Sequence, residues 1–453
     1  MRLSPRWSAA LSRGAVLMLV TGVLGGTVVV GGAGASYAID GDDCTDINQV
    51  GEPGEVEVTE FAGDGSPSKT LQIAAAQRRV KELTGHTAGH GVAVAVLDSG
   101  VEPQTGLTVV RGKPVDGAAT TPDPVWYQGT LLAGVIAAGP DPKSGQPVGI
   151  APGAAIYDER IYDTGTDTND ELTQVGPDSV AAGLEAIAPY VHKRGIRIVT
   201  VGVSVADTPR LRAAVDLVTR KGAIIVAASG ARSDPDPEAP AATYRDGEDY
   251  ADFAWPAGYA KAGGEREANP LVVSVTTTAA PGDGTADLAL EDYILFSSAI
   301  DVAAPTGGVV SLGLNERFCA IREPSPAVAA AEVSGVLALL MTAYPHDSPK
   351  QLITRLEATA SGAANVDPST PNTRVGKGIV QPLEALTRPL APTRKGALPQ
   401  SLLPEQEAAP AVLPVPDPDV LASTRDNAVW WGLLGGGALI VLVLLRPVLS
   451  RRR

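Results

Sequence analysis

The feature that most constrains the fold is a series of short, unbroken apolar stretches rich in Val, Ile and Ala. Four such stretches occupy Gly91–Leu97, Arg197–Val203, Ala223–Ala228 and Leu271–Thr276. They show little of the apolar and polar alternation that marks a strand with one face in water. They therefore predict strands buried on both faces, as in a parallel sheet covered by helices.

Helical patterns lie between these predicted strands. They fall at Ser179–Lys193, Thr208–Lys221, Val328–Ala343 and Pro349–Ala360, with an earlier helix around Lys69–Leu83. Alternating strands and helices imply right-handed crossovers, so the sequence predicts a doubly wound α/β domain with a parallel sheet. With 453 residues, the chain has room for this domain plus appendages, or for two ordinary domains.

The first 38 residues are typical of a secretory signal peptide. Arg2, Arg6 and Arg13 form a basic start, an apolar stretch covers residues 14–32, and small residues precede a cleavage position after Ala38. An uncleaved N-terminal anchor is the alternative interpretation.

A second apolar run, residues 428–445, predicts a transmembrane helix. Its 18 uncharged residues span roughly 27 Å at ~1.5 Å per residue, just enough for a bilayer core. Trp430 and Trp431 stand at its entrance, and residues 446–453, which carry four arginines, follow it. By the positive-inside rule this basic tail is cytoplasmic, and the chain is a single-pass protein of the cell membrane with its bulk extracytoplasmic. A buried core helix is the alternative.

Three further segments complete the predicted organisation. Residues 39–89 form a polar N-terminal extension, and residues 90–387 hold the α/β domain. Residues 388–427 contain eight prolines and no apolar periodicity, which is typical of a stiff, extended linker.

Cys44 and Cys319 are the only cysteines of the chain. Two thiols are too few for a structural zinc site, and an exported chain meets oxidants, so we predict one disulfide between them. Two unpaired thiols are the alternative.

The chain is acidic, with a net charge of −15 and a pI near 4.8. Such a charge disfavours nucleic-acid binding, which requires a basic surface. A loop-like segment, residues 231–267, concentrates acidic side chains at Asp234, Asp236, Glu238, Asp246, Glu248, Asp249 and Asp252. Their spacing is not that of a known calcium site, so we interpret them as solvated surface, with calcium as the alternative, and expect no metal and no cofactor.

Three stretches occur in an informative order. Val92–Val101 (VAVAVLDSGV) comes first, Gln128–Ala138 (QGTLLAGVIAA) with Gly149–Gly153 (GIAPG) second, and Val333–Leu340 (VSGVLALL), preceded by Asp301–Pro305 (DVAAP), third. Together they resemble the subtilisin-like serine proteases, and specifically the membrane-anchored mycosins of actinobacterial type VII secretion systems. The resemblance covers about residues 90–387, and the predicted signal peptide, linker and anchor extend it to most of the chain.

The resemblance implies a catalytic site of four parts: an aspartate orients a histidine, the histidine deprotonates a serine, and an asparagine amide helps to hold the oxyanion. Asp98 matches the aspartate. Gln128 stands in place of the histidine, Ala327 in place of the serine, and Ala231 in place of the asparagine. A glutamine amide cannot take up and return a proton near neutral pH, and a methyl group has no nucleophilic oxygen. The sequence therefore predicts a pseudoprotease, in which Asp98 keeps a structural role such as capping its own turn.

No other side chain is expected to replace the missing groups. The predicted elements place all four histidines at element ends remote from Asp98: His86, His90, His192 and His346. A register slip could move Ser325 toward the position of Ala327, but its hydroxyl would still lack a base. Ser99 and Ser204 are interpreted as a turn and a strand residue.

The resemblance further implies a structural or partner-binding role beside the proteins of the type VII secretion membrane complex. Two alternatives remain. One is an active subtilisin-like serine endopeptidase with a rearranged site, and the other is a cleft that binds peptides without cutting them.

Overall fold

The computed structural model describes residues 43–46, 55–116, 121–164, 175–232, 248–261, 267–278, 293–362, 372–399 and 422–449. A parallel sheet of seven strands organises the larger unit, in the order β2-β3-β1-β4-β5-β6-β7. The strands are β1 (Ala93–Asp98), β2 (Thr108–Arg111), β3 (Ala155–Arg160), β4 (Ile196–Val201), β5 (Ile224–Ala228), β6 (Val272–Thr278) and β7 (Val302–Pro305). A separate antiparallel pair is formed by β8 (Val309–Leu312) and β9 (Phe318–Ile321).

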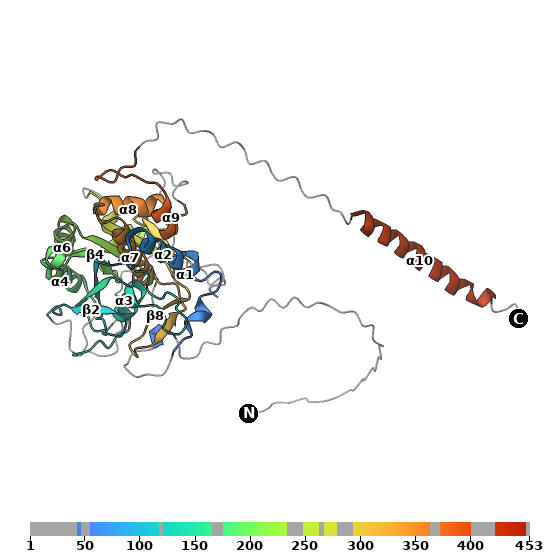
Figure 1. Ribbon diagram of the computed structural model, residues 1–453, viewed down its shortest axis with the longest axis horizontal. Helices are drawn as coiled ribbons and strands as arrows, with labels where there is room; N and C mark the ends of the chain where they lie inside the picture. Colours follow the sequence, from blue (N-terminus) through green and yellow to red (C-terminus); the bar gives the residue numbers. More distant parts are fainter. Residues whose placement is uncertain are drawn as a thin grey trace, which may run out of the picture. The chain divides into compact units, whose positions relative to one another are not determined.

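Helices cover both faces of the sheet (Figure 1). One face packs against α4 (Pro177–Ile187), α5 (Tyr190–Lys193) and α6 (Pro209–Arg220). The other face packs against α2 (Ile73–Thr84), α3 (Gln128–Ala137), α7 (Pro326–Ala343), α8 (Pro349–Ala358) and α9 (Pro382–Thr387). Alternate residues of β1 enter opposite layers, which explains why the strand is apolar throughout and confirms the predicted doubly wound α/β fold.

The predicted elements and the observed ones differ mainly in number and continuity. All four predicted strands are present as β1, β4, β5 and β6, whereas β2, β3 and β7 were not predicted as strands. The helix expected around Lys69–Leu83 is divided into α1 (Pro67–Thr70) and α2, because Gln72 between them takes a left-handed φ of 53°. The helix expected at Ser179–Lys193 is divided at Pro189, which lacks the N–H that a continuous helix requires.

Helix α7 is the central helix of the domain and is buried along almost its whole length. Gly335 faces Ile150 so closely that an added Cβ would lie 2.8 Å from the Ile150 Cβ. The same helix carries Glu332, which is 3% exposed and whose Oε2 has no hydrogen-bond partner among the described residues. Burial raises the pKa of Glu332 well above its usual value, because the apolar surroundings disfavour a charged carboxylate.

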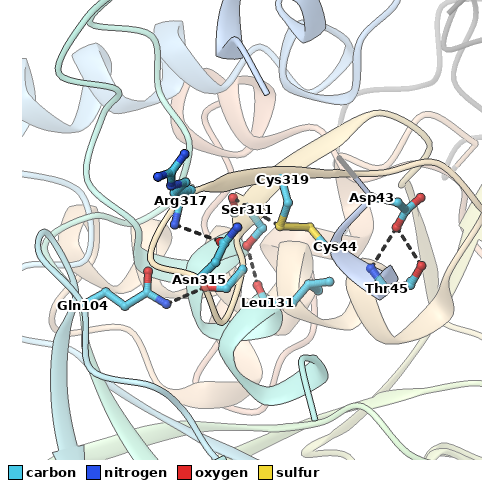
Figure 2. The surroundings of a disulfide bond; sticks show 10 residues. Asp43, Cys44, Thr45, Gln104, Leu131, Ser311, Asn315, Arg317 and Cys319 are labelled. Carbon is cyan, nitrogen blue, oxygen red and sulfur yellow. Dashed lines mark hydrogen bonds between the residues drawn. A yellow bond between two sulfur atoms is a disulfide. The ribbon is translucent and has the colours of Figure 1, made fainter. Parts of the chain in front are cut away.

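A disulfide joins Cys44 to Cys319 on β9, as the cysteine count predicted (Figure 2). Asp43 pairs with Ala320 in a short bridge, and the Val56 amide donates to the Phe318 carbonyl oxygen at 3.0 Å. On the neighbouring strand, the Ser311 hydroxyl donates to the Leu131 carbonyl oxygen at 2.6 Å and so ties β8 to α3. The disulfide therefore fastens the N-terminal extension to the β8–β9 pair.

The second unit, residues 400–453, contains the single described helix α10 (Ala422–Leu449). Within it, Asn427–Arg446 is long and apolar enough to cross a membrane, with a mean hydropathy of 2.2 and no burial against the protein. Pro326–Ala343 passes the same test of length and hydropathy but lies in the domain core. The expected signal peptide (1–38) and most of the expected linker lie outside the described residues.

Replacing both cysteines, as Cys44→Ser with Cys319→Ser, is expected to lower the free energy of unfolding by about 2–4 kcal/mol, because the bridge closes a long loop in the unfolded chain. Urea unfolding followed by tryptophan fluorescence measures the loss. Ser311→Ala, which removes one hydrogen bond beside the bridge, is the matched control and should cost about 1 kcal/mol. Equal stability of the double variant and the wild type would contradict the expectation.

Candidate functional site

Asp98 is the last residue of β1 and lies at the carboxyl edge of the sheet, where open α/β folds place their sites. Its side chain is fully buried. The Tyr162 hydroxyl donates to Oδ1 at 2.7 Å, and the Ser99 amide donates to the same oxygen at 2.8 Å. The Gln128 side-chain amide donates to Oδ2 at 3.1 Å. A carboxylate with no basic partner is thus held by three neutral donors.

Gln128 is the first residue of α3, and Gly129 and Gly202 allow the backbone to pack closely around it. A Cβ added at Gly129 would lie 2.3 Å from the carbonyl oxygen of Gly100, so only glycine fits between this helix and the turn after β1. A Cβ added at Gly202 would lie 3.0 Å from Asp98 Oδ2 and 3.3 Å from Gln128 Nε2. The Asp98–Gln128 contact is therefore enclosed from both sides by backbone.

The electrostatics of this pair follow from burial. Removal from water raises the pKa of Asp98, while the hydrogen bonds from Tyr162, Ser99 and Gln128 oppose the rise. Burial and the adjacent Asp98 raise the pKa of Tyr162 well above its usual value, so its hydroxyl stays protonated and remains a donor. The net effect of the site is to disfavour the charged form of Asp98, and its neighbours Tyr162, Ser99 and Gln128 supply hydrogen bonds but no imidazole to exchange protons with it.

The geometry limits what Gln128 can do chemically. Its NH2 group is used on Asp98, and its carbonyl oxygen can accept a hydrogen bond but cannot become a proton carrier near neutral pH. A carboxylate in this position would orient a histidine and would stabilise the histidine's protonated form. It can only hold the Gln128 amide in place.

The other two positions expected in the site lie on separate elements. Ala327 is the second residue of α7 and is partly exposed there. Ala231 follows β5 after Ser229 and Gly230 and bridges to Ile294. Each contributes a methyl group. The structure thus brings Asp98 and Gln128 into direct contact, and the two alanines add no hydrogen-bonding side chain.

Ser325 caps the helix that follows it. Its hydroxyl accepts from the Val328 amide at 3.4 Å, and its own amide donates to the Thr306 hydroxyl at 2.9 Å. These contacts define a helix N-cap, for which serine is a preferred residue. The hydroxyl of Ser204 donates to the Ala228 carbonyl oxygen at 3.2 Å.

The four histidines lie at the protein surface, whereas Asp98 is sealed from water. The rings of His86 and His90 stack on each other with centroids 4.2 Å apart. His192 belongs to α5, and His346 follows the end of α7. The hydrogen-bond partners of Asp98 are Tyr162, Ser99 and Gln128, and none of them is a histidine.

Sequence reasoning missed two contributors to this site. Tyr162 comes two residues after β3, the strand that pairs with β1 so that Asp98 faces Arg160. A prediction of β3 would have placed Tyr162 at the same sheet edge as Asp98. Ser99, interpreted only as a turn residue, is fully buried; its hydroxyl donates to the Trp126 carbonyl oxygen at 3.0 Å and accepts from the Gly129 amide at 3.1 Å.

Part of the acidic segment 231–267 can be described. Asp249 receives the Lys261 ammonium at 2.8 Å and the Ser298 amide at 2.8 Å. Partial burial would raise its pKa, but the hydrogen bonds from Lys261 and Ser298 lower it to about 2. Asp234, Asp236, Glu238 and Asp246 lie outside the described residues. Within the described ranges, no cluster of three metal-ligating side chains occurs.

Comparisons with known proteins agree with this architecture. Residues 89–378 match the subtilase family model. Mycosin-1 of Mycobacterium tuberculosis (strain ATCC 25618 / H37Rv) is 30% identical over 398 residues, covering 80% of this chain and 82% of the relative. Mycosin-4 of the same strain is 28% identical over 399 residues, covering 81% and 78%. These matches confirm the family resemblance of the motifs.

Two solved structures show the same fold. MycP1 from Mycobacterium smegmatis has a TM-score of 0.55 at 22% identity, covering 79% of this chain and 92% of that chain. A chain in the structure of an intact ESX-5 inner membrane complex has a TM-score of 0.54 at 23% identity, covering 89% and 95%.

As the pH rises from 4 to 8, the free energy of unfolding of Asp98→Asn is expected to increase relative to that of the wild type. The folded pKa of Asp98 lies above the unfolded value of about 3.9, so its stabilising contribution is complete below that value and is lost as pH rises through the folded pKa. The shift amounts to about 1.4 kcal/mol for each pH unit between the two pKa values.

Urea unfolding at several pH values measures this shift. Asp252→Asn, at an exposed aspartate, is the control and should show no such trend. A difference between wild type and Asp98→Asn that stays constant from pH 4 to 8 would contradict the expectation.

Proposed function

Because this chain belongs to the subtilase family, and within it to the mycosins, we propose that it is a membrane-anchored pseudoprotease that acts as a structural or partner-binding component of a type VII secretion system. The observation that carries the proposal is the contact between Asp98 and the Gln128 amide. At the one carboxylate that the family's chemistry requires, the partner is a group that cannot shuttle protons.

The expected loss of catalysis is large. In subtilisin, removal of the serine or the histidine alone costs about 10⁶-fold in turnover. Removal of one oxyanion donor costs about 10²–10³-fold. Here Gln128, Ala327 and Ala231 stand at all three positions, and Ser325 is engaged as a helix cap.

A role in a membrane complex is supported by two further observations. The chain shares its fold with a component of the ESX-5 inner membrane complex over nearly the whole length of that component. The exposed apolar helix Asn427–Arg446, with arginines after it, suits a single-pass anchor that leaves residues 90–387 extracytoplasmic. In this arrangement the domain presents its surface to partners at the membrane.

A serine-directed fluorophosphonate is expected to leave the detergent-solubilised full chain unlabelled, because Ala327 stands in place of the nucleophile and none of the described serines is hydrogen-bonded to a histidine. Intact-mass spectrometry measures the label, and active subtilisin treated in parallel is the positive control. Covalent modification of Ser325, or of any other serine, would instead support an active endopeptidase with a rearranged site.

Deletion of the chain is expected to reduce recovery of the type VII secretion membrane complex from detergent extracts, measured by affinity purification of another component and quantitative mass spectrometry. A gene copy carrying Asp98→Asn should restore recovery to the wild-type level, because the proposed role needs no catalysis. Undiminished recovery without the chain would remove the scaffold role, and rescue by wild type but not by Asp98→Asn would argue for a chemical one.

A further inference from the structure

An open hollow of about 900 Å³ lies beside β3, between α4 and the loop that follows β2. Tyr157 and Glu159 of β3 form its floor. Helix α4 contributes the small side chains of Ser179, Ala182 and Ala186 and the acidic side chains of Asp178 and Glu185.

The charged groups that line this hollow are nearly all paired with one another. Arg210 of α6 donates to Glu185 at 2.8 Å and lies 3.5 Å from Asp178. Lys113 lies 3.7 Å from Asp116. Three of the four lining carboxylates therefore share two basic groups, and the fourth is Glu159.

Glu159 is unusual among these acids because it is buried. It is 1% exposed, and its Oε1 has no hydrogen-bond partner among the described residues. A Cβ added at Gly112 would lie 2.4 Å from Oε2, so the backbone of the loop after β2 covers the other oxygen. An unpaired buried carboxyl group is costly, and here it borders a hollow large enough for a ligand.

Two tyrosine rings lie beside this acid. Tyr157, two residues before Glu159 on the same face of β3, and Tyr190 of α5 have ring centroids 5.6 Å apart. Both line the hollow. A carboxyl group next to aromatic faces is an environment that recognises a planar organic cation, through a hydrogen bond to the unpaired oxygen and stacking on the rings.

We propose that this hollow binds a guanidinium group, supplied by an arginine side chain of a protein segment, with Glu159 as its anion and Tyr157 and Tyr190 as its aromatic walls. The site is built on β3, whereas Asp98 ends β1, and it does not depend on the function proposed above. A guanidinium fits better than a metal ion, because Arg210 already neutralises Glu185 and Asp178.

Binding of a guanidinium requires the carboxyl group of Glu159 to lose its proton. Burial, followed by the charge of Asp158, raises the pKa of Glu159 to about 8, so the empty site holds mostly the neutral acid at pH 7. A guanidinium favours the ionised form, and its affinity should therefore rise between pH 6 and pH 9. The charged and titratable groups around the site are Lys113, Asp116, Tyr157, Asp158, Asp178, Glu185, Tyr190, Arg194 and Arg210.

The test uses the full chain in lipid nanodiscs and isothermal titration calorimetry. The probes are acetyl-Gly-Arg-Gly-amide, the same peptide with citrulline in place of arginine, and free L-arginine. Citrulline keeps the shape and loses the charge, so the arginine peptide should bind at least about tenfold more tightly. Titration at pH 7 in buffers of different ionisation enthalpy should reveal proton release. Stronger binding of the peptide than of free arginine identifies a protein segment as the source; the reverse identifies a small molecule.

Three variants complete the experiment. Glu159→Gln should weaken binding of the arginine peptide at least about tenfold and abolish the proton release, with a melting temperature equal to or above that of the wild type. Ala182→Trp, which fills the hollow and keeps Glu159, should weaken binding similarly. Glu82→Gln, at an exposed glutamate of α2, should bind like the wild type. Equal binding of the two peptides, no binding of either, or unchanged binding by Glu159→Gln would overturn the proposal.

Discussion

A carboxylate sealed from water at the end of the central strand is the constraint around which the described site is arranged. Burial penalises its charge, so the surrounding chain has to supply donors, and it does so from three directions: a turn amide, a tyrosine from the neighbouring strand and the amide of Gln128 at the start of α3. The close backbone approaches at Gly129 and Gly202 follow from this arrangement. Asp98 thus links the end of β1 to the turn after it, to the start of α3 and to the segment after β3.

Much of this architecture could be predicted from local patterns. Strands such as β5 are apolar without interruption because both faces are covered, and the sequence alone therefore predicts them. Strand β3 (AIYDER) was missed because half of it is charged. Arg160 is held there partly by Thr121, which lies 39 residues earlier in the chain, and no local pattern predicts such a contact. Tyr162 was missed together with the strand, although Asp98 and Gln128 were both found.

Two consecutive buried charged residues of β3, Glu159 and Arg160, differ in whether they have a charged partner. Arg160 is paired with Asp163, and its guanidinium also donates to the Thr121 carbonyl oxygen at 2.9 Å. Glu159 points to the opposite face, and its Oε1 has no hydrogen-bond partner among the described residues. Because side chains alternate along a strand, the two groups cannot neutralise each other despite being consecutive. The pleat of the strand therefore separates a structural ion pair from an acid that borders the hollow.

The lone acid in α7 has a consequence for how the two long apolar helices of the described residues differ toward lipid. Pro326–Ala343 and Asn427–Arg446 are both long and apolar enough to cross a membrane, yet only the second is exposed in its own unit. Glu332 stands near the middle of the first, and an acidic side chain at that depth makes insertion into lipid less favourable by about 3 kcal/mol. The helix Asn427–Arg446 has no acid in its apolar stretch. A bilayer would therefore accept the terminal helix more readily than the core helix.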